Sequence, residues 1–249
     1  MGQAVLAVAQ DYPGVRISAV LVRAGSKLLG QDAGGIAYGA DLPKALAASD
    51  VLVDFSTPAS THAAIDACLA ARKPLVIGVT GLDAALLQKI EQASHAIAVL
   101  AAPNMSLGAN LLLQLAATAA LALGEQFDVE IGEAHHRHKQ DAPSGTALAL
   151  GQAVAEARGV RLEEHAVFQR TGRGGARQPG SIGFTSVRAG DIVGDHSVLL
   201  AGPGERLELS HRAESRATFA RGALAAARWL SSRPAGRYQM ADVLAIDAR

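Results

Sequence analysis

The sequence predicts an α/β fold, in which helices cover both faces of a doubly wound parallel sheet, together with a second α+β domain that carries a mixed sheet. Helical and strand patterns alternate through the first hundred residues. The expected strands are short continuous apolar runs, as in sheets that are buried on both faces. Gly occurs 26 times and aromatic residues make up only 4% of the chain, which suits an α/β enzyme with tight backbone packing.

The first part of the chain divides into short periodic segments. Hydrophobic spacing predicts helices at Gln3–Gln10, Ser60–Ala71 and Ala84–Ala93, and strands at Val15–Val22, Val51–Phe55, Leu75–Val79 and Ala96–Ala101. A sheet of this kind binds ligands at the carboxyl ends of its strands. We therefore expect a binding site where these strands end.

The pattern changes after residue 102. The expected elements are a long helix at Leu107–Leu123, a strand at Phe127–Glu133, a helix from Ser144 to Arg158, strands at Ser181–Arg188, Asp191–Leu200 and Arg206–His211, a helix at Ala217–Leu230, and a short element at Met240–Ile246. Runs of strands after helices are typical of an α+β domain.

Composition argues against several classes of protein. Lys plus Arg and Asp plus Glu each number 23, so the net charge is zero and neither a nucleic acid nor a membrane surface is the expected partner. No apolar run is expected to reach the roughly 20 residues that span a bilayer, and the first residues do not read as a basic region followed by an apolar core, so neither membrane insertion nor export is expected. The single cysteine, Cys68, lies in a predicted helix as a small buried hydrophobe, which favours the reducing cytoplasm.

The stretch Glu133–Ala147 concentrates groups that can do chemistry. The preceding strand alternates, with Phe127, Val129 and Ile131 on one face, so it delivers His135 and His136 to its C-terminal end. Neighbouring residues at a strand end point in different directions. The two histidines are therefore expected to have different functions.

A helix start follows this strand. Ser144 is a plausible N-cap, and the amides of Gly145 and Thr146 then point out of the first turn. Such amides, with the positive end of the helix dipole, bind anions, and a carboxylate is a natural ligand. Lys139, in the intervening loop, can supply a charge to the same ligand or a proton to a carbanion-like centre.

The cluster of His135, His136, His138 and Lys139 has two other interpretations. The His and Lys cluster could be a solvated basic loop, or His135, His136 and His138 could bind zinc with Glu133 or Asp141. Against zinc, the histidines lack helical i, i+4 spacing and Lys139 would lie beside the cation.

The Gly- and Arg-rich segment Arg170–Gly180 lacks a preceding strand and a following helix, which favours a mobile loop over a phosphate-binding element.

The Glu133–Ala147 segment resembles the signature of the dihydrodipicolinate reductase (4-hydroxy-tetrahydrodipicolinate reductase) family, and the resemblance extends along the chain. The further matching segments are Val51–Ser56, Val76–Gly81, Ala102–Gly108, Gly180–Phe184 and Arg188–His196. This resemblance implies a Rossmann-like first domain made of residues 1–102 and 217–249, and a substrate-binding and oligomerisation domain at 103–216. It also implies a cytoplasmic homotetramer joined through the second domain's sheet.

The resemblance further implies an NAD(P)H-dependent reduction of 4-hydroxy-tetrahydrodipicolinate, in lysine biosynthesis through diaminopimelate. Matching positions make His135 the acid/base and Lys139 the proton donor, with the substrate carboxylates held by His136, Gly145 and Thr146. Matching cofactor positions are Met1, Arg23, Gly78, Val79, Thr80, Ala102, Pro103, Asn104 and Met105. Val22 stands where many members carry an acidic residue, and Arg23 can pair with a 2′-phosphate, so NADPH is favoured over NADH.

The family's first strand and most of its Gly-rich phosphate loop have no counterpart in the sequence, which opens at the helix that follows them. We therefore expect the functional protein to start upstream, with Met1 an internal methionine. The alternative functions are a truncated, catalytically weak dinucleotide-binding sensor, a reductase of another cyclic imine dicarboxylate, and a metal-dependent hydrolase.

Overall fold

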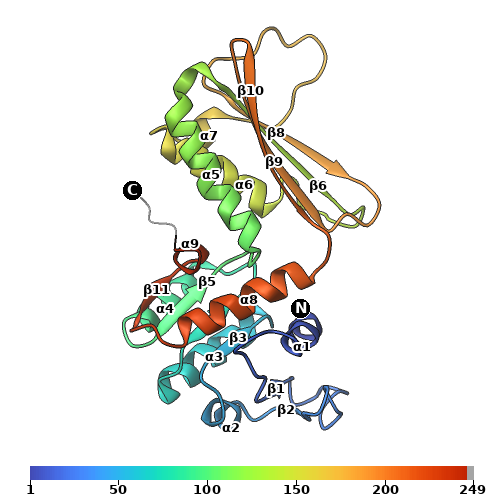
Figure 1. Cartoon of the computed structure of the whole chain (residues 1–249), viewed down its shortest axis with the longest axis vertical. Helices are drawn as coiled ribbons and strands as arrows, with labels where there is room; N and C mark the ends of the chain where they lie inside the picture. Colours follow the sequence, from blue (N-terminus) through green and yellow to red (C-terminus); the bar gives the residue numbers. More distant parts are fainter. Residues whose placement is uncertain (246–249) are drawn as a thin grey trace. The chain divides into compact units, whose positions relative to one another are not determined.

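The structure, a computed structural model, describes residues 1–245 and contains two compact units. Unit 1 comprises Met1–Ser106 and the chain that begins at Ala217, and unit 2 comprises Leu107–Arg216. The colours of Figure 1 follow this path: blue to cyan segments and the red C-terminal helix build unit 1, and green to orange segments build unit 2. Unit 1 is thus discontinuous in sequence.

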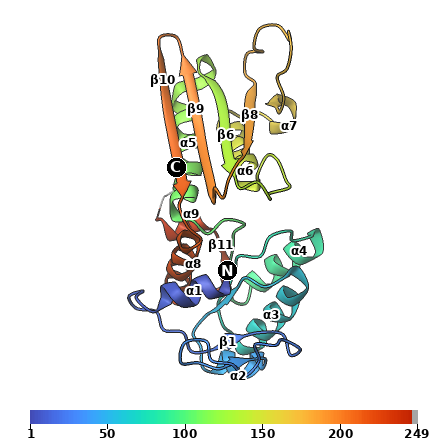
Figure 2. The same cartoon turned by 90° about the vertical axis from the view of Figure 1, so that its right-hand side faces the viewer.

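Unit 1 is built on a four-stranded parallel sheet. Its strands, in the order β11-β5-β4-β3, are β3 (Leu52–Asp54), β4 (Leu75–Ile77), β5 (Ala98–Ala101) and β11 (Gly236–Tyr238). Helices α3 (Pro58–Ala71) and α4 (Ala84–Ser94) lie on one side, and α1 (Gly2–Ala9) and α8 (Ala217–Leu230) on the other (Figure 2). This is the expected Rossmann-like arrangement, and it explains the continuous apolar runs of the strands.

Local signals set the helix starts in unit 1. Thr57 caps α3 by accepting a hydrogen bond from the Ser60 amide, and Asp83 caps α4 by accepting one from the Leu86 amide. Cys68 on α3 is fully buried in the core, and burial, with a smaller contribution from Asp54, raises the pKa of its thiol to about 12. The prediction of a buried cysteine is confirmed, and a raised pKa disfavours the reactive thiolate.

The predicted strand Val15–Val22 is much shorter in the structure. Only β1 (Val20–Leu21) is paired as a strand, and its partner is β2 (Tyr38–Gly39), in a separate two-stranded parallel sheet. Val15 and Ile17 instead pack against α1 and α8. Their apolar pattern therefore reflects side-chain burial without a strand ladder, which periodicity alone does not distinguish.

Unit 2 has a five-stranded mixed sheet in the order β10-β9-β6-β8-β7. The strands are β6 (Asp128–His135), β7 (Ala166–Val167), β8 (Ile182–Arg188), β9 (Gly194–Gly202) and β10 (Glu205–Ala213). β6 runs parallel to β8 and antiparallel to β9. Helices α5 (Leu107–Leu123) and α6 (Gly145–Ala157) cover one face of this sheet (Figure 2), so the predicted α+β organisation is confirmed.

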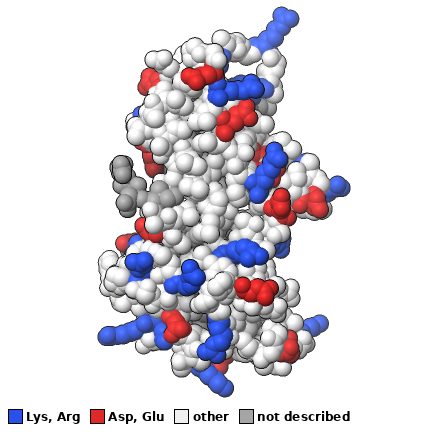
Figure 3. Space-filling view, viewed as in Figure 1, with Lys and Arg blue, Asp and Glu red and all other residues white. Residues whose placement is uncertain are grey.

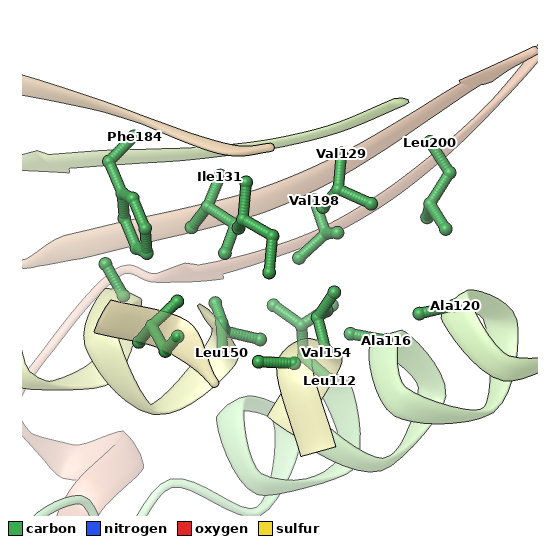
Figure 4. Packing of buried hydrophobic residues seen from close by; sticks show 14 residues of the cluster. Leu112, Ala116, Ala120, Val129, Ile131, Leu150, Val154, Phe184, Val198 and Leu200 are labelled. Atoms are coloured by element: carbon green, nitrogen blue, oxygen red, sulfur yellow. The ribbon is translucent and has the colours of Figure 1, made fainter. Parts of the chain in front are cut away.

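The core of unit 2 lies between the sheet and these two helices. Figure 4 shows Val129, Ile131 and Val198 pointing from the sheet toward Leu150 and Val154 of α6. All five side chains are almost completely buried. Burying side chains of this size contributes about 1.5–3 kcal/mol each to folding, which fixes the face of β6 that points inward.

Helix α5 corrects one expectation from the sequence. With the 3₁₀ turn η1 (Gly124–Gln126) it forms a segment, Leu107–Gln126, of 20 residues that is long and apolar enough to cross a membrane by length and composition. Its Leu112, Ala116 and Ala120 nevertheless lie in the core of unit 2. We interpret α5 as a core helix with an unusually apolar outer face.

Several short elements were not predicted. They are α2 (Leu42–Ala47), β2, α7 (Leu162–His165), β7 and β11. The final predicted element is α9 (Met240–Val243), and its expected end, Ile246, lies outside the described residues. Side chains of both charge signs are spread over the face drawn in Figure 3, in keeping with the zero net charge.

Candidate functional site

The C-terminal end of β6 organises the chemistry of unit 2. Along β6 the buried residues alternate, and Val129, Ile131 and Glu133 point to the helix-covered face. Because the side-chain period of a strand is two residues, His135 lies on this same face. The strand thus carries a hydrophobic core along most of its length and two ionisable groups at its end.

Glu133 is the most densely bonded of these groups. Its side chain is 1% exposed. Its carboxylate accepts two hydrogen bonds from the Arg188 guanidinium, at 2.8 and 2.7 Å, and one from the Ser144 amide at 3.3 Å. The carboxylate also lies 2.5 Å from Nδ1 of His135. One buried carboxylate therefore connects β6, β8 and the start of α6.

These contacts shift the pKa values of both residues. Burial raises the pKa of Glu133, but hydrogen bonds from Arg188, His135 and Ser186 outweigh burial and lower it to about 2. For His135, burial is the largest effect and lowers the pKa, Glu133 opposes it, and Lys139 and Arg188 add to the lowering. The site therefore combines a carboxylate that favours its ionised form with an imidazole that favours its neutral form.

A second histidine, His196 on β9, lies against the first. The two ring centroids are 5.1 Å apart in an edge-to-face arrangement, and Nε2 of His196 is 3.0 Å from the hydroxyl of Ser144. Burial, reinforced by the nearby His135, lowers the pKa of His196 to about 4. His196 is thus a neutral buried group that supports the first turn of α6.

The start of α6 has the geometry of an anion site. Ser144 caps the helix by accepting a hydrogen bond from the Ala147 amide at 3.2 Å, as predicted. Gly145 is exposed, and the position of its missing Cβ faces open space. Since the first-turn amides of a helix have no acceptor within it, this end attracts negative charge.

Lys139 lies in the loop between β6 and α6. Its ammonium donates to both carboxylate oxygens of Asp141 at 2.8 Å, and it is close enough to His135 to lower the pKa of that imidazole. The rings of His136 and His138 lie 6.3 Å apart between centroids, in a tilted arrangement. Within residues 1–245, no group of three or more His, Cys, Asp or Glu side chains is arranged to hold a metal ion.

The predicted cofactor residues lie in unit 1, at the carboxyl ends of adjacent parallel strands. Gly78, Val79 and Thr80 follow β4, and the segment from Ala102 to Met105 follows β5. The amide of Ala102 bonds to the Ile77 carbonyl at 3.0 Å, so the two segments leave the sheet side by side. Val79 and Met105 have buried side chains, whereas Thr80 and Pro103 are exposed.

Two further predicted cofactor positions lie near the start of the chain. Met1 precedes α1 and packs, half-buried, against Val5 and its neighbours. Arg23 follows β1 and is exposed, and no side chain among the described residues pairs with its guanidinium. Arg23 is therefore available for an anionic ligand.

Gly78 has a structural role that the sequence did not reveal. A Cβ at this position would lie 2.1 Å from Cε1 of the Phe55 ring. The glycine thus lets the ring of Phe55 cross the end of β4, and a larger residue would displace it. The motif Val76–Gly81 is in part a packing motif.

The Gly- and Arg-rich segment contacts the sheet of unit 2. Arg177 forms ion pairs with Asp128 and Glu130, and Arg170 also binds Glu130. These carboxylates belong to the beginning of β6, and no contact joins either arginine to His135 at its other end. The segment is therefore not part of the candidate site in unit 2.

Sequence reasoning missed three residues of this site. Glu133 was considered only as a metal ligand, and Arg188 and His196 were noted in matching segments without a role. The register explains their presence, since Arg188 lies opposite His135 and His196 lies opposite Glu133. The sequence predicted strands at Ser181–Arg188 and Asp191–Leu200 but not this pairing.

Comparison with known proteins gives consistent matches over both units. Residues 1–105 match the family described as "Dihydrodipicolinate reductase, N-terminus", and residues 108–244 match "Dihydrodipicolinate reductase, C-terminus". The 4-hydroxy-tetrahydrodipicolinate reductase of Thiobacillus denitrificans is 52% identical over 253 residues, covering 99% of this chain and 95% of the relative. That of Alkalilimnicola ehrlichii is 50% identical over 254 residues, with the same coverage.

Solved structures agree with these matches. The dipicolinate-bound dihydrodipicolinate reductase from Paenisporosarcina sp. TG-14 is 25% identical, with a TM-score of 0.74, covering 96% of this chain and 92% of that one. GenD2 from gentamicin A biosynthesis, in complex with NAD, has a TM-score of 0.57 at 16% identity, a likeness of fold alone.

Proposed function

The chain belongs to the dihydrodipicolinate reductase family, and we propose that it reduces 4-hydroxy-tetrahydrodipicolinate to tetrahydrodipicolinate with NADPH or NADH, in lysine biosynthesis through diaminopimelate. The observation that carries this proposal is the buried assembly of unit 2, in which His135 is bound to Glu133 beside the capped start of α6. An acid/base imidazole next to an anion site suits a substrate that carries carboxylates and must be protonated.

The residues of unit 2 take the following roles in this proposal. Gly145 and Thr146, in the first turn of α6, hold a substrate carboxylate through their backbone, with the helix dipole behind them. His136, just past the end of β6, assists in binding. Lys139 gives the substrate a proton, and His135 acts as acid and base through its imidazole. Dipicolinate, the molecule bound in the Paenisporosarcina enzyme, is a dicarboxylate of the kind that this site suits.

The residues of unit 1 fit a nicotinamide cofactor. The segments that begin at Gly78 and Ala102 lie at the carboxyl ends of β4 and β5, with exposed groups at Thr80 and Pro103, where sheets of this class bind nucleotides. Asn104 and the buried Val79 and Met105 complete this rim. When bound, the nicotinamide supplies the hydride of the reaction.

The proposed coenzyme preference rests on the charge of the residues expected to lie near the adenine ribose of the coenzyme. Arg23 is exposed without a partner among the described side chains, and the residue before it is Val22. An unpaired guanidinium favours the 2′-phosphate of NADPH, since Arg binds phosphate in a bidentate manner. Met1, at the start of α1, would lie at the end of the phosphate-binding loop. We therefore propose NADPH as the preferred coenzyme.

Assembly into a cytoplasmic homotetramer is also part of the proposal. The face of the unit 2 sheet opposite α5 and α6 is not covered by a helix of that unit (Figure 2), and its outward residues include Thr185, Val187, Ser197 and Leu199. The side chain of Val187 is 46% exposed. An uncovered sheet face of this kind supports association with a second copy.

The decisive test measures oxidation of NADPH and NADH with freshly generated 4-hydroxy-tetrahydrodipicolinate. We expect His135→Gln and Lys139→Met each to lower kcat about 100-fold, in the range that general acid–base groups contribute. The control His138→Gln alters an exposed neighbour and should retain activity. If the unaltered chain fails to turn over this substrate yet reduces another cyclic imine, the proposed substrate is wrong.

A further inference from the structure

We propose that the buried ion pair of Glu133 and Arg188 positions the reactive groups of unit 2, directing Nε2 of His135 to the substrate and fixing the Lys139 loop and the start of α6 around it. This inference rests on the proposed function, because it concerns how the same site is held. It assigns no contact with substrate to Glu133 or Arg188, which act through their neighbours.

The contacts of the pair reach each functional part of the site. Glu133 binds Nδ1 of His135 at 2.5 Å and the Ser144 amide at 3.3 Å, immediately before Gly145. Arg188 donates to the Asp141 carbonyl at 2.6 Å. Asp141 in turn holds the Lys139 ammonium through its carboxylate at 2.8 Å. A single anchor therefore links the imidazole, the anion site and the lysine.

The bond to Glu133 selects one tautomer of His135. A carboxylate whose pKa is about 2 is ionised at neutral pH and can only accept hydrogen bonds. Nδ1 of His135 must therefore carry the hydrogen, and in the neutral ring the lone pair lies on Nε2. His135 acts at Nε2, as a base when neutral and as an acid when protonated.

A glycine borders Nε2 of His135. A Cβ at Gly194 of β9 would lie only 3.1 Å from this nitrogen, so the glycine provides the open space in front of it. The charged and titratable groups that face the ring are Glu133, Arg188 and Lys139, with His196 packed against its edge. Only Glu133 among them favours the protonated ring.

A matched ion pair on the same strand separates positioning from simple stabilisation. Glu130 lies three residues before Glu133, on the other face of β6, and pairs with Arg177 and Arg170. Like Glu133 it ties β6 to a distant segment through arginine. Unlike Glu133, it has no contact with the histidines. Glu130→Gln is therefore the control for Glu133→Gln.

The experiment uses the full chain with ¹⁵N-labelled histidine. NMR of the unaltered protein is expected to show His135 as the Nδ1–H tautomer near neutral pH, and Glu133→Gln is expected to shift it toward the Nε2–H tautomer or a mixture. Glu130→Gln should leave the tautomer unchanged. This measurement needs no turnover, so it tests the inference even if the proposed function fails.

Kinetics provide the second measurement. We expect Glu133→Gln to lower kcat about 100-fold with KM changed less than about threefold, within the range of acid–base contributions. Removing the carboxylate lowers the pKa of His135 further, so the acidic limb of the pH–rate profile should move to lower pH. Arg188→Lys, which keeps the charge but loses the bidentate geometry, should have a smaller effect than Arg188→Met.

Two results would overturn the inference. One is an Nε2–H tautomer of His135 in the unaltered protein, a result that holds even if every variant misfolds. The other is a folded Glu133→Gln protein with the same tautomer, kcat and pH profile as Glu130→Gln. In that case the pair would be structural only. If the unaltered chain shows the expected tautomer but does not reduce the substrate, that result would contradict the proposed function and leave this inference standing.

Discussion

At the residue scale, the buried His196 of unit 2 shows how burial links stability to pH. His196 is 4% exposed, and its pKa lies at about 4 in the folded chain against an ordinary value of 6.5. Between about pH 4 and pH 6.5, His196 binds a proton in the unfolded chain but not in the folded chain. Stability therefore falls as the pH drops from about 6.5 toward 4, and the protonation of His196 opposes folding.

This predicts a specific pH effect. The shift corresponds to a loss on the order of 3 kcal/mol between neutral pH and pH 4. Urea unfolding at several pH values should show the loss in the unaltered chain and a smaller one in His196→Gln. The exposed His95, changed to Gln, is the control. Equal pH dependence in the two variants would show that His196 is not responsible.

Gly78 provides a second prediction at this scale. Its missing Cβ would lie 2.1 and 2.6 Å from two atoms of the Phe55 ring, so Gly78→Ala must displace the ring. Overpacking of this kind costs about 1–3 kcal/mol. Gly25→Ala, at a position with open space, should cost much less in the same unfolding experiment. A neutral Gly78→Ala would contradict this packing.

At the element scale, the cap of α6 has both a structural and a functional role. Ser144 accepts a hydrogen bond from the Ala147 amide, its own amide binds Glu133, and its hydroxyl meets Nε2 of His196. The N-caps of α3 and α4 lack this second set of contacts. The start of α6 is thus fixed by the sheet as well as by its own cap.

We therefore predict that Ser144→Ala lowers stability by about 0.5–2 kcal/mol through the lost cap, with an added cost from the unpaired His196. It should also raise KM for the dicarboxylate, because the first turn of α6 is proposed to bind it. Asp83→Ala removes the cap of α4, where Asp83 bonds to the Leu86 amide at 2.8 Å. This control should lose comparable stability with KM unchanged, and a parallel rise in KM would contradict the proposed role.

At the scale of the whole molecule, the uncovered sheet face of unit 2 is the proposed assembly surface. Val187 points outward on β8 and is 46% exposed, opposite Ala134 of β6. A charge at its position would have to be buried if two such faces met, and an unpaired buried charge is strongly unfavourable.

Val187→Glu is accordingly predicted to reduce the molar mass measured by light scattering after gel filtration. Leu121→Glu is the control, since Leu121 is 67% exposed on α5 rather than on the sheet. We expect this control to keep the mass of the unaltered protein. A tetramer that persists in Val187→Glu would exclude this part of the sheet as the main interface.

The sequence by itself determined the elements whose signals are local. The apolar spacing of Leu107–Leu123 and Ala217–Leu230 and the Ser144 cap all gave helices that the structure contains at those positions. The residues of Glu133–Ala147 indicated the dihydrodipicolinate reductase family. Each of these signals depends on residues within a few positions of one another, where side-chain direction follows directly from backbone period.

Only the tertiary structure decided which distant groups meet. Glu133 and Arg188 are 55 positions apart and Ser144 and His196 are 52 apart, and their contacts depend on the register of β6 with β8 and β9. A shift of one residue would turn these side chains to the other face of the sheet. The run Val15–Val22 shows the same limit, because strand formation requires a neighbouring strand as well as an apolar pattern. The sequence supplies the reactive groups, and strand pairing determines their partners.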